Sequence, residues 1–292
     1  MNEHETGYFT EESSADIVAG RNAACKDERL KEVMEVVIRH LHAAVKEIKP
    51  TQAEWSKAIE FLTATGHKCD RWRQEFILLS DVLGVSMLVD AINAGRPEGA
   101  SENTVLGPFH IDGAPKYEHG RNICLDRKGE DLVVRGRVLD IDGNPVAGAT
   151  VDVWQANDEG FYDVQQKDLQ PAFNLRGVFT TDEQGGYWFR SVKPKFYSIP
   201  HDGPVGKMLD SLGRHPRRPA HLHFIISREG FDTLTTHIFD PDDPYIHSDA
   251  VFGVKESLTA DFQKIGNPQK AKELDFDGEY WEVEFNFVLA PG

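Results

Sequence analysis

The chain has 292 residues, of which 40% are hydrophobic, and a formal net charge of −16 at pH 7. A chain of this length and composition can bury a substantial core, in one large domain or two modest ones. The strong negative charge opposes sequence-independent binding to nucleic acid or to anionic membrane surfaces.

The first residues, MNEHETGYFTEESS, are acidic and contain no apolar run. Nowhere in the chain do the roughly 18 apolar residues of a membrane span follow one another, so we expect a cytoplasmic protein. The three cysteines, Cys25, Cys69 and Cys124, share no C-x-x-C spacing. This pattern argues against a disulfide framework and against a thiolate zinc site.

Three helices are predicted in the first third of the chain. Apolar residues in the segment 27–49 recur at the spacing of a helix with one buried stripe. Residues 51–54, TQAE, have the form of a capping box that opens a second helix, which ends at Gly66. A third helix, predicted at 70–92, is apolar nearly all round, so the rest of the chain or a second subunit should cover both of its sides.

A segment rich in Gly, Pro and Asn, residues 95–116, marks a domain boundary. We predict a helical domain at 1–103 and a second domain at 104–292. In the second domain the apolar residues follow the shorter period of β-strands. The predicted strands are residues 132–140, 148–155, 177–182, 186–192, 220–227, 233–239 and 281–289. Short strands separated by turn clusters are typical of an antiparallel β-sandwich, so the fold class is mainly β with α; a late helix is predicted at 256–265.

The tripeptide HLH occurs in the first predicted helix, with His40 and His42, and in a predicted strand, with His221 and His223. Residues two apart in a helix point about 200° apart, so the first pair cannot hold one ion. Residues two apart in a strand share a face, with Cα atoms about 6.6 Å apart, and two imidazoles at that spacing can meet one metal. The second pair is therefore a candidate chelate. The alternative is a polar stripe that faces solvent.

Two tyrosines among turn signals are candidates for further ligands. Tyr162 follows a strand and a glycine in WQANDEGFYD, and Tyr197 lies between prolines in KPKFYSIPHDGP. The alternative for each is an ordinary half-buried tyrosine. A phenol with a pKa near 10 becomes an effective ligand only beside a strongly charged ion. Such a hard oxygen donor favours a trivalent metal over zinc or copper(I).

These residues resemble those of the intradiol ring-cleaving dioxygenases, non-haem iron enzymes that open catechol-type rings between the two hydroxyl-bearing carbons. Five segments carry the resemblance over nearly the whole chain: QEFILLSDVLGVS, ENTVLGPF, VDVWQANDEGFYD, KPKFYSIPHDGPVG, and RRPAHLHF followed by LTTHIFD. The resemblance implies Fe(III) bound by Tyr162, Tyr197, His221 and His223, with Tyr197 leaving the metal when substrate binds. It also implies that Arg218 stabilises the substrate as negative charge develops on its ring.

The roles of two further residues, His237 and Arg218, each have an alternative interpretation. Many relatives have glutamine where this chain has His237, fourteen positions after His223. His237 can hydrogen-bond a ligand or the substrate, or it can compete for the metal as a further imidazole. The arginines Arg214, Arg217 and Arg218 cluster in an otherwise acidic protein. We assign the functional role to Arg218 only, and its alternative is a surface arginine.

The resemblance also implies a substrate pocket. Its expected lining is Leu78, Asp81, Val105, Leu106, Gly107, Pro108, Phe109, Ile199, Pro200 and Val251. The segment GPFHIDGAP is more similar to the corresponding segment of hydroxyquinol 1,2-dioxygenases than to that of catechol enzymes. Asp81 can accept a hydrogen bond from a third ring hydroxyl, or it can be a helix carboxylate paired with an arginine. We expect cleavage of 1,2,4-trihydroxybenzene with O2 to 3-hydroxy-cis,cis-muconate (maleylacetate). Catechol or chlorocatechol is the alternative substrate.

The resemblance further implies a homodimer joined through the N-terminal helical region, in some members with a phospholipid bound there. Two other classes of protein stay open. The stretch VVRGRVLDIDGNPVAGATVDVW resembles non-enzymatic sandwich modules that act as spacers or binding domains. A zinc-dependent sandwich hydrolase would use the same histidine pair. Ferric phenolate ligation absorbs visible light and a zinc site does not, so the colour of the protein separates these classes.

Overall fold

The computed structural model describes residues 8–71, 73–93 and 95–292. It divides into two compact units, Met1–Ala64 and Thr65–Gly292. The second unit contains two helices that precede residue 103 as well as all of the strands. The compact units and the predicted domains therefore divide the chain differently, and the domain boundary at residue 103 stays a prediction.

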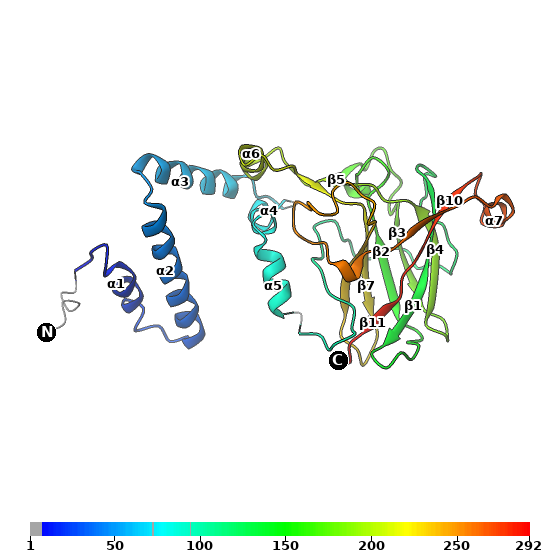
Figure 1. Ribbon diagram of the computed structural model, residues 1–292, viewed down its shortest axis with the longest axis horizontal. Helices are drawn as coiled ribbons and strands as arrows, with labels where there is room; N and C mark the ends of the chain where they lie inside the picture. Colours follow the sequence, from blue (N-terminus) through cyan, green and yellow to red (C-terminus); the bar gives the residue numbers. More distant parts are fainter. Residues whose placement is uncertain (1–7, 72, 94) are drawn as a thin grey trace. The chain divides into compact units, whose positions relative to one another are not determined.

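The first unit is helical. It contains α1 (Ser14–Gly20), α2 (Glu28–Ile48) and most of α3 (Gln52–His67) (Figure 1). The carboxylate of Asp27 accepts a hydrogen bond from the backbone N–H of Leu30 at 2.9 Å and begins α2. The predicted capping box is confirmed, because Thr51 N donates to Glu54 Oε2 at 2.7 Å and Glu54 N donates to Thr51 Oγ1 at 3.3 Å.

The first HLH copy lies on a helix, α2, as predicted. His40 is exposed, whereas His42 Nδ1 lies 3.0 Å from Ser14 Oγ of α1. The two imidazoles thus have separate surroundings. None of the helices in the part of the chain that the structure describes combines the length and apolar character of a membrane span.

The third predicted helix is interrupted. Residues 70–92 were expected to form one helix, but the structure has α4 (Glu75–Val82) and α5 (Val85–Asn93). Gly84, with φ of 74°, adopts the left-handed conformation and donates its N–H to the carbonyl of Asp81 at 3.0 Å. The expectation was wrong because apolar residues continue through the break and conceal it.

Two sheets make up the sandwich in the second unit. One contains β1 (Asp131–Asp140), β4 (Gly186–Val192), β9 (Phe262–Ile265), β10 (Tyr280–Glu284) and β11 (Phe287–Leu289). The other has the order β3 (Arg176–Thr180), β2 (Thr150–Trp154), β7 (His221–Ser227), β8 (Leu234–Phe239). A short ribbon pairs β5 (Tyr197–Ser198) with β6 (Arg217–Arg218).

The pairing departs from a wholly antiparallel sandwich in one sheet. The sheet β3-β2-β7-β8 is antiparallel throughout. In the other sheet β1 is antiparallel to β4 but parallel to β10 and β11. The apolar run predicted as one strand at 281–289 is divided into β10 and β11, which pair with successive parts of β1.

The remaining helices are short. They are α6 (Pro204–Ser211), α7 (Pro268–Glu273) and the 3₁₀ helices η1 (Asp163–Gln165) and η2 (Glu256–Leu258). The predicted helix at 256–265 was wrong. Only its first turn is helical, because the following residues form β9 and pair with β10. Pairing with a strand distant in sequence overrides the local helical period there.

The core lies between the sheets and receives alternate residues of each strand. On β7, Leu222, Phe224 and Ile226 are fully buried among apolar residues of both sheets. His221 and His223 alternate with them, so they lie on the opposite face of the same strand. This alternation places a polar site directly behind the apolar core.

A matched pair of leucines tests the importance of this core. Leu222→Ala is expected to lower the free energy of unfolding by about 2–5 kcal/mol, because the truncation leaves a cavity in a closely packed interior. Leu169, which is 69% exposed, serves as the control; Leu169→Ala should change that free energy by no more than about 0.5 kcal/mol. Urea unfolding measures both, and equal effects would contradict the assignment of Leu222 to the core.

Candidate metal centre

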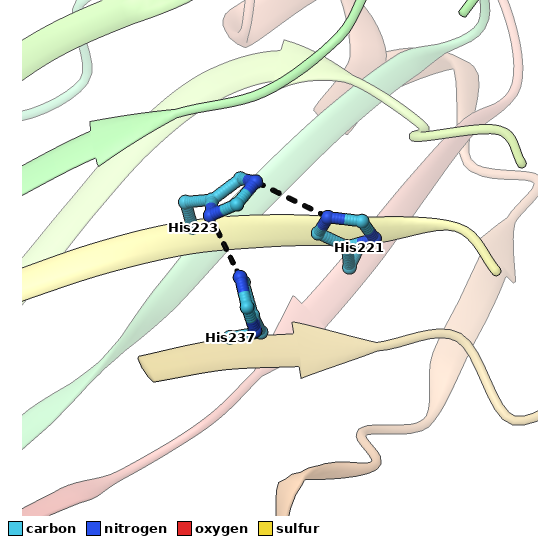
Figure 2. Close-up of side chains that lie close together, drawn as sticks. All are labelled: His221, His223 and His237. Atoms are coloured by element: carbon cyan, nitrogen blue, oxygen red, sulfur yellow. Dashed lines mark hydrogen bonds between the residues drawn. The ribbon is translucent and has the colours of Figure 1, made fainter. Parts of the chain in front are cut away.

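The histidine pair of β7 is buried. His221 is 3% exposed and His223 is 2% exposed, which rules out a stripe that faces solvent. Both imidazoles lie on the same side of the strand (Figure 2). Their Nε2 atoms are 3.2 Å apart. The Nδ1 atom of His221 lies 2.7 Å from the carbonyl oxygen of Pro219, which can only accept. His221 therefore carries its proton on Nδ1 and keeps the lone pair of Nε2 for another partner.

A row of side chains across the antiparallel sheet supports His223. The strand register places Arg176, Trp154, His223 and His237 opposite one another on four successive strands. The indole of Trp154 stacks on the His223 ring, with centroids 4.7 Å apart and an interplanar angle of 13°. From the neighbouring strand β8, His237 Nε2 lies 2.7 Å from His223 Nδ1 (Figure 2). The stacked indole thus fixes the plane of the His223 ring, and the contact at Nδ1 fixes its rotation within that plane.

His237 is part of the row that supports His223. Its Nε2 atom is not directed at the Nε2 atoms of His221 and His223. Its Nε2 faces the Nδ1 edge of His223, while its own Nδ1 lies 2.5 Å from Thr104 Oγ1. The three imidazoles are close enough for a metal cluster, with ligand atoms within 4.8 Å of one another. The hydrogen-bonded contact, however, favours the interpretation that His237 orients His223 over the interpretation that it competes for a metal.

Two tyrosines come to the same place from separate segments. Tyr162, at 1% exposure, follows β2 at the start of η1, where its N–H donates to Gln165 Oε1 at 2.9 Å. Its phenol oxygen lies 2.9 Å from His223 Nε2. Tyr197 on β5 is 7% exposed, and its phenol oxygen lies 3.5 Å from that of Tyr162. The structure thus brings together all four side chains expected to act as ligands.

Three separations that link the four donor atoms are compatible with one ion. They are 2.9 Å from Tyr162 to His223, 3.2 Å between the imidazoles and 3.5 Å between the phenols. For metal bonds of about 2.1 Å, two ligands at 90–120° lie about 3.0–3.6 Å apart. Two phenol oxygens with two imidazole nitrogens are donors that suit a hard, highly charged cation.

Burial controls the protonation of the donors. Burial, with a contribution from Arg218, lowers the pKa of His221 to about 3. Burial and the neighbouring rings of His237 and His221 hold the pKa of His223 well below its ordinary value. Both imidazoles are therefore neutral at pH 7, with lone pairs available. Burial raises the pKa of the Tyr162 phenol well above its ordinary value, and the nearby Tyr197 raises it further. A bound cation would reverse this effect by favouring the phenolate.

Arg218 is the cation of the site. It is 3% exposed and lies directly opposite Tyr197 in the ribbon of β5 and β6. Its Nη1 atom is 3.5 Å from the phenol oxygen of Tyr197 and 3.4 Å from His221 Nε2. Although burial acts to lower the pKa of Arg218, Asp249 and Tyr197 raise it, so the guanidinium keeps its charge.

The other two arginines of the cluster have different partners. Arg214 donates from Nη1 to the carbonyl of Val82 at 2.7 Å, which ties it to the end of α4. Arg217 donates to the phenol of Tyr245, and its guanidinium lies 5.1 Å from the ring centroid of Phe196. Neither contact involves the four candidate ligands, so Arg218 is the member of the cluster that faces them.

The expected pocket residues of the boundary loop reach the site at two positions. Phe109 stacks on Tyr162, with ring centroids 4.6 Å apart. Gly107 has φ of 75°, and a Cβ there would lie 3.1 Å from Cε1 of His223, so both its backbone conformation and this close approach favour glycine. Val105 is half-buried and Pro108 exposed, whereas Leu106 is 45% exposed and does not line a closed pocket by itself.

The expected residues from α4 and the later loops gather in a second apolar cluster. Leu78 packs there with Ile199, Val251 and other residues. Ile199 and Pro200 also line a cavity of about 540 Å³ beside Gly160. Asp81 is half-buried; burial raises its pKa, and a hydrogen bond to Ser86 and the charge of Arg218 oppose that increase.

Several supporting residues were not anticipated. Thr104, Trp154 and Asp249 contact His237, His223 and Arg218 respectively. A larger cavity, of about 860 Å³, is bordered by Asp249, and its described lining includes none of the four candidate ligands. Only the strand register could have suggested Trp154, and no signal in the sequence points to Asp249.

Comparisons with known proteins find similar chains over nearly the whole length. The family model described as "Dioxygenase" matches residues 105–291, and "Catechol dioxygenase N terminus" matches residues 27–101. The chain is 67% identical over 287 residues to hydroxyquinol 1,2-dioxygenase of Rhizobium sp. (strain MTP-10005), with coverage of 98% of this chain and 97% of that protein. It is 49% identical to 6-chlorohydroxyquinol 1,2-dioxygenase of Cupriavidus pinatubonensis, with coverage of 94% and 95%.

Solved structures give the same result. The crystal structure of hydroxyquinol 1,2-dioxygenase from Pseudomonas putida DLL-E4 matches with a TM-score of 0.92 and 47% identity, over 97% of this chain and 99% of that one. Wild-type catechol 1,2-dioxygenase of Acinetobacter radioresistens matches with a TM-score of 0.84 and 28% identity, over 98% and 94%. From its donor geometry, its family models and its near full-length relatives, the chain belongs to the intradiol ring-cleavage dioxygenases.

Proposed function

We propose that this enzyme cleaves hydroxyquinol (1,2,4-trihydroxybenzene) between its adjacent hydroxyl-bearing carbons. Both atoms of O2 enter the product, 3-hydroxy-cis,cis-muconate, the enol form of maleylacetate. The observation that carries the proposal is the meeting of two phenols and two imidazoles beside a buried guanidinium. The similarity to relatives named for hydroxyquinol favours this substrate over catechol. Family membership over nearly the whole chain argues against a non-enzymatic module and against a zinc hydrolase.

The cofactor that we propose is Fe(III), held by Tyr162, Tyr197, His221 and His223. The hard phenol oxygens and the spacing of 2.9–3.5 Å between donors support this choice. When bound, ferric iron supplies a Lewis acid that withdraws electron density from a bound diol and prepares its ring for reaction with O2.

Tyr197 and Arg218 have connected roles in this proposal. Tyr197 would hold the metal in the resting enzyme and would give way to the bound diol, and its phenol oxygen lies 3.5 Å from Arg218 Nη1. At this distance the guanidinium would stabilise negative charge on the Tyr197 oxygen and the negative charge that develops on the ring of the substrate. The apolar rings of Phe109 and Trp154 exclude water around the donors, which strengthens these electrostatic interactions.

Oxygen uptake with two substrates tests the proposal directly. Iron-loaded protein is expected to absorb visible light through charge transfer from phenolate to iron and to consume O2 with hydroxyquinol. Turnover of catechol should be slower. Iron-loaded protein that lacks the visible band, or that turns over catechol faster than hydroxyquinol, would contradict the cofactor or the substrate respectively.

We propose that Asp81 determines the preference for a substrate with a third hydroxyl group. Its hydrogen bond is to Ser86, and Arg218 acts on it as a nearby charge without an ion pair among the described residues, which weakens the alternative of a helix carboxylate paired with an arginine. Asp81→Ala should lower the preference for hydroxyquinol over catechol, as the ratio of kcat/KM values, by about 10- to 100-fold, because the third hydroxyl loses its acceptor. Asp90→Ala, which removes a carboxylate of α5 paired with Lys255, is the control and should leave the ratio unchanged.

His237 is proposed to hold His223 in the orientation that binds iron. His237→Leu removes the acceptor at His223 Nδ1 and should weaken iron binding by about 10- to 100-fold. His237→Gln keeps a side-chain acceptor and should retain most of the affinity. Competition with a chelator measures binding without reference to activity. Equal affinities of the leucine variant and the parent protein would show that the contact of 2.7 Å does not support the site.

We also propose a homodimer formed through the helical region. The apolar stripe of α2, expected to be buried, is largely exposed in the single chain, with Leu41 at 60%, Val45 at 56% and Ile48 at 71%. A stripe of this size on one helix favours burial against a second surface. A phospholipid is proposed to bind in the same region, where Lys46, Lys49 and Trp55 border a cavity of about 660 Å³. Light scattering at micromolar concentration tests the dimer, and lipid extraction followed by mass spectrometry tests the lipid.

A further inference from the structure

One buried carboxylate connects the cation of the site with a wall of the pocket. Asp249, 6% exposed, lies between β8 and η2. Its two oxygens accept four hydrogen bonds. Arg218 donates from Nε at 3.2 Å and from Nη2 at 3.3 Å, and the backbone N–H groups of Val251 and Gly253 donate at 3.2 Å and 2.9 Å. Few positions remain on this carboxylate for any other partner.

The carboxylate decides which edge of the guanidinium faces the candidate ligands. A guanidinium is a rigid planar fork, so two contacts on one edge fix the direction of the remaining nitrogen. Because Nε and Nη2 of Arg218 face Asp249, Nη1 is directed at the phenol of Tyr197 and at His221. Without its partner the buried guanidinium would lose both its orientation and its compensating charge.

The same carboxylate also holds the loop that follows it. Oxygen Oδ1 of Asp249 accepts from both Arg218 Nε and Val251 N, so the arginine and the loop share one atom. Val251 is 4% exposed and packs with Ile199 and Leu78, two other residues expected in the pocket. A displacement of Asp249 would therefore move the cation and this apolar wall together.

We propose that Asp249 is a positioning residue that sets the direction of the Arg218 guanidinium and the place of the Val251 wall through one carboxylate. The inference rests on the proposed function, in which Arg218 stabilises developing charge. It assigns to Asp249 an effect on both turnover and the choice between hydroxyquinol and catechol. In this proposal the carboxylate acts through Arg218 and Val251 and is neither a metal ligand nor a substrate contact.

Steady-state kinetics of iron-loaded protein with Asp249→Asn, Arg218→Lys and the double variant test the inference. Asp249→Asn should retain the visible band, since no proposed ligand changes. Its kcat should fall by about 10- to 100-fold, and the ratio of kcat/KM for hydroxyquinol to that for catechol should shift. In the double variant Asp249→Asn should lower kcat less than about threefold beyond Arg218→Lys, because residues that act as a unit are not additive.

A second turn-forming carboxylate provides the control. Asp182 accepts from the N–H groups of Gln184 and Gly186 at 2.8 Å and 2.7 Å, in the turn between β3 and β4. Asp182→Asn should keep kcat and the substrate ratio. The inference is overturned if the effects of Asp249→Asn and Arg218→Lys multiply, or if Asp249→Asn keeps the full kcat.

A substitute variant keeps the test decisive if Asp249→Asn is unstable, and a separate result identifies failure of the proposed function. If Asp249→Asn does not fold, Asp249→Glu replaces it, since this variant keeps the charge and displaces the oxygens by one methylene. A reduced kcat with an intact visible band supports the inference, and an unchanged kcat overturns it. Failure of the proposed function is recognised separately, because the parent protein would then show neither the band nor O2 uptake with any diol.

Discussion

Tyr162→Phe is expected to abolish most of the visible charge-transfer absorption of the iron-loaded protein and to lower the rate of O2 uptake by at least about 10³-fold. The substitution removes one oxygen from a site whose donors lie 2.9–3.5 Å apart and leaves the ring in place. It also removes one of the two negative charges that the phenols would offer to Fe(III). Absorption spectra and oxygen-electrode rates on the same preparation measure both effects.

Tyr187 is a matched control for this substitution. It is also buried, at 2% exposure, and its phenol donates to the carbonyl of Phe285 at 2.8 Å, within the core of the sandwich. Tyr187→Phe should cost about 1 kcal/mol of stability and leave the spectrum unchanged. An unaltered band and full activity in Tyr162→Phe would mean that Tyr162 is not a ligand.

Arg218→Lys should lower kcat for hydroxyquinol by about 10²- to 10³-fold while the visible band persists. Lysine keeps the charge, but it is a single point donor and cannot present one edge to Asp249 and another to Tyr197. The loss should therefore appear mainly in kcat, since the interaction develops with the charge on the ring. Stopped-flow and steady-state measurements separate this effect from binding.

Arg217 provides the control for Arg218. It is the adjacent residue on β6, but its guanidinium lies 5.0 Å from the ring centroid of Tyr245 and faces away from the ligands. Arg217→Lys should change kcat by less than about threefold. Similar losses in the two variants would assign the effect to general disruption of the ribbon, and a fully active Arg218→Lys would remove Arg218 from the mechanism.

For the candidate metal centre, period and spacing were sufficient to predict how the two histidine pairs are arranged on their backbones. The period of 3.6 excluded His40 and His42 as a chelate, and the period of 2 placed His221 and His223 on one face with Leu222 directed into the core. Both expectations are properties of the backbone alone. The turn signals made the two tyrosines candidates only. Grouping them with the histidines required the resemblance to a family, because that meeting is set by the packing of distant segments.

The failures have the opposite cause. Gly84 ends α4 inside an apolar run, so hydrophobic periodicity could not detect it. Residues 262–265 became a strand because β10 pairs with them, which no local pattern could reveal. Asp249 follows no motif, and its partner Arg218 is 31 positions earlier in the chain. Contacts that depend on strand register or on loop closure cannot be predicted from hydrophobic period and composition.

The row of side chains across the antiparallel sheet also restricts how the sequence can change in evolution. Its members are Arg176, Trp154, His223 and His237. Each strand contributes one member, and side chains alternate between the two faces with a period of two. A one-residue deletion inside β7 would turn an imidazole toward hydrocarbon and Leu222 toward the oxygen donors. Insertions and deletions should therefore accumulate in the turns that join these strands, while within the strands change is restricted to substitution.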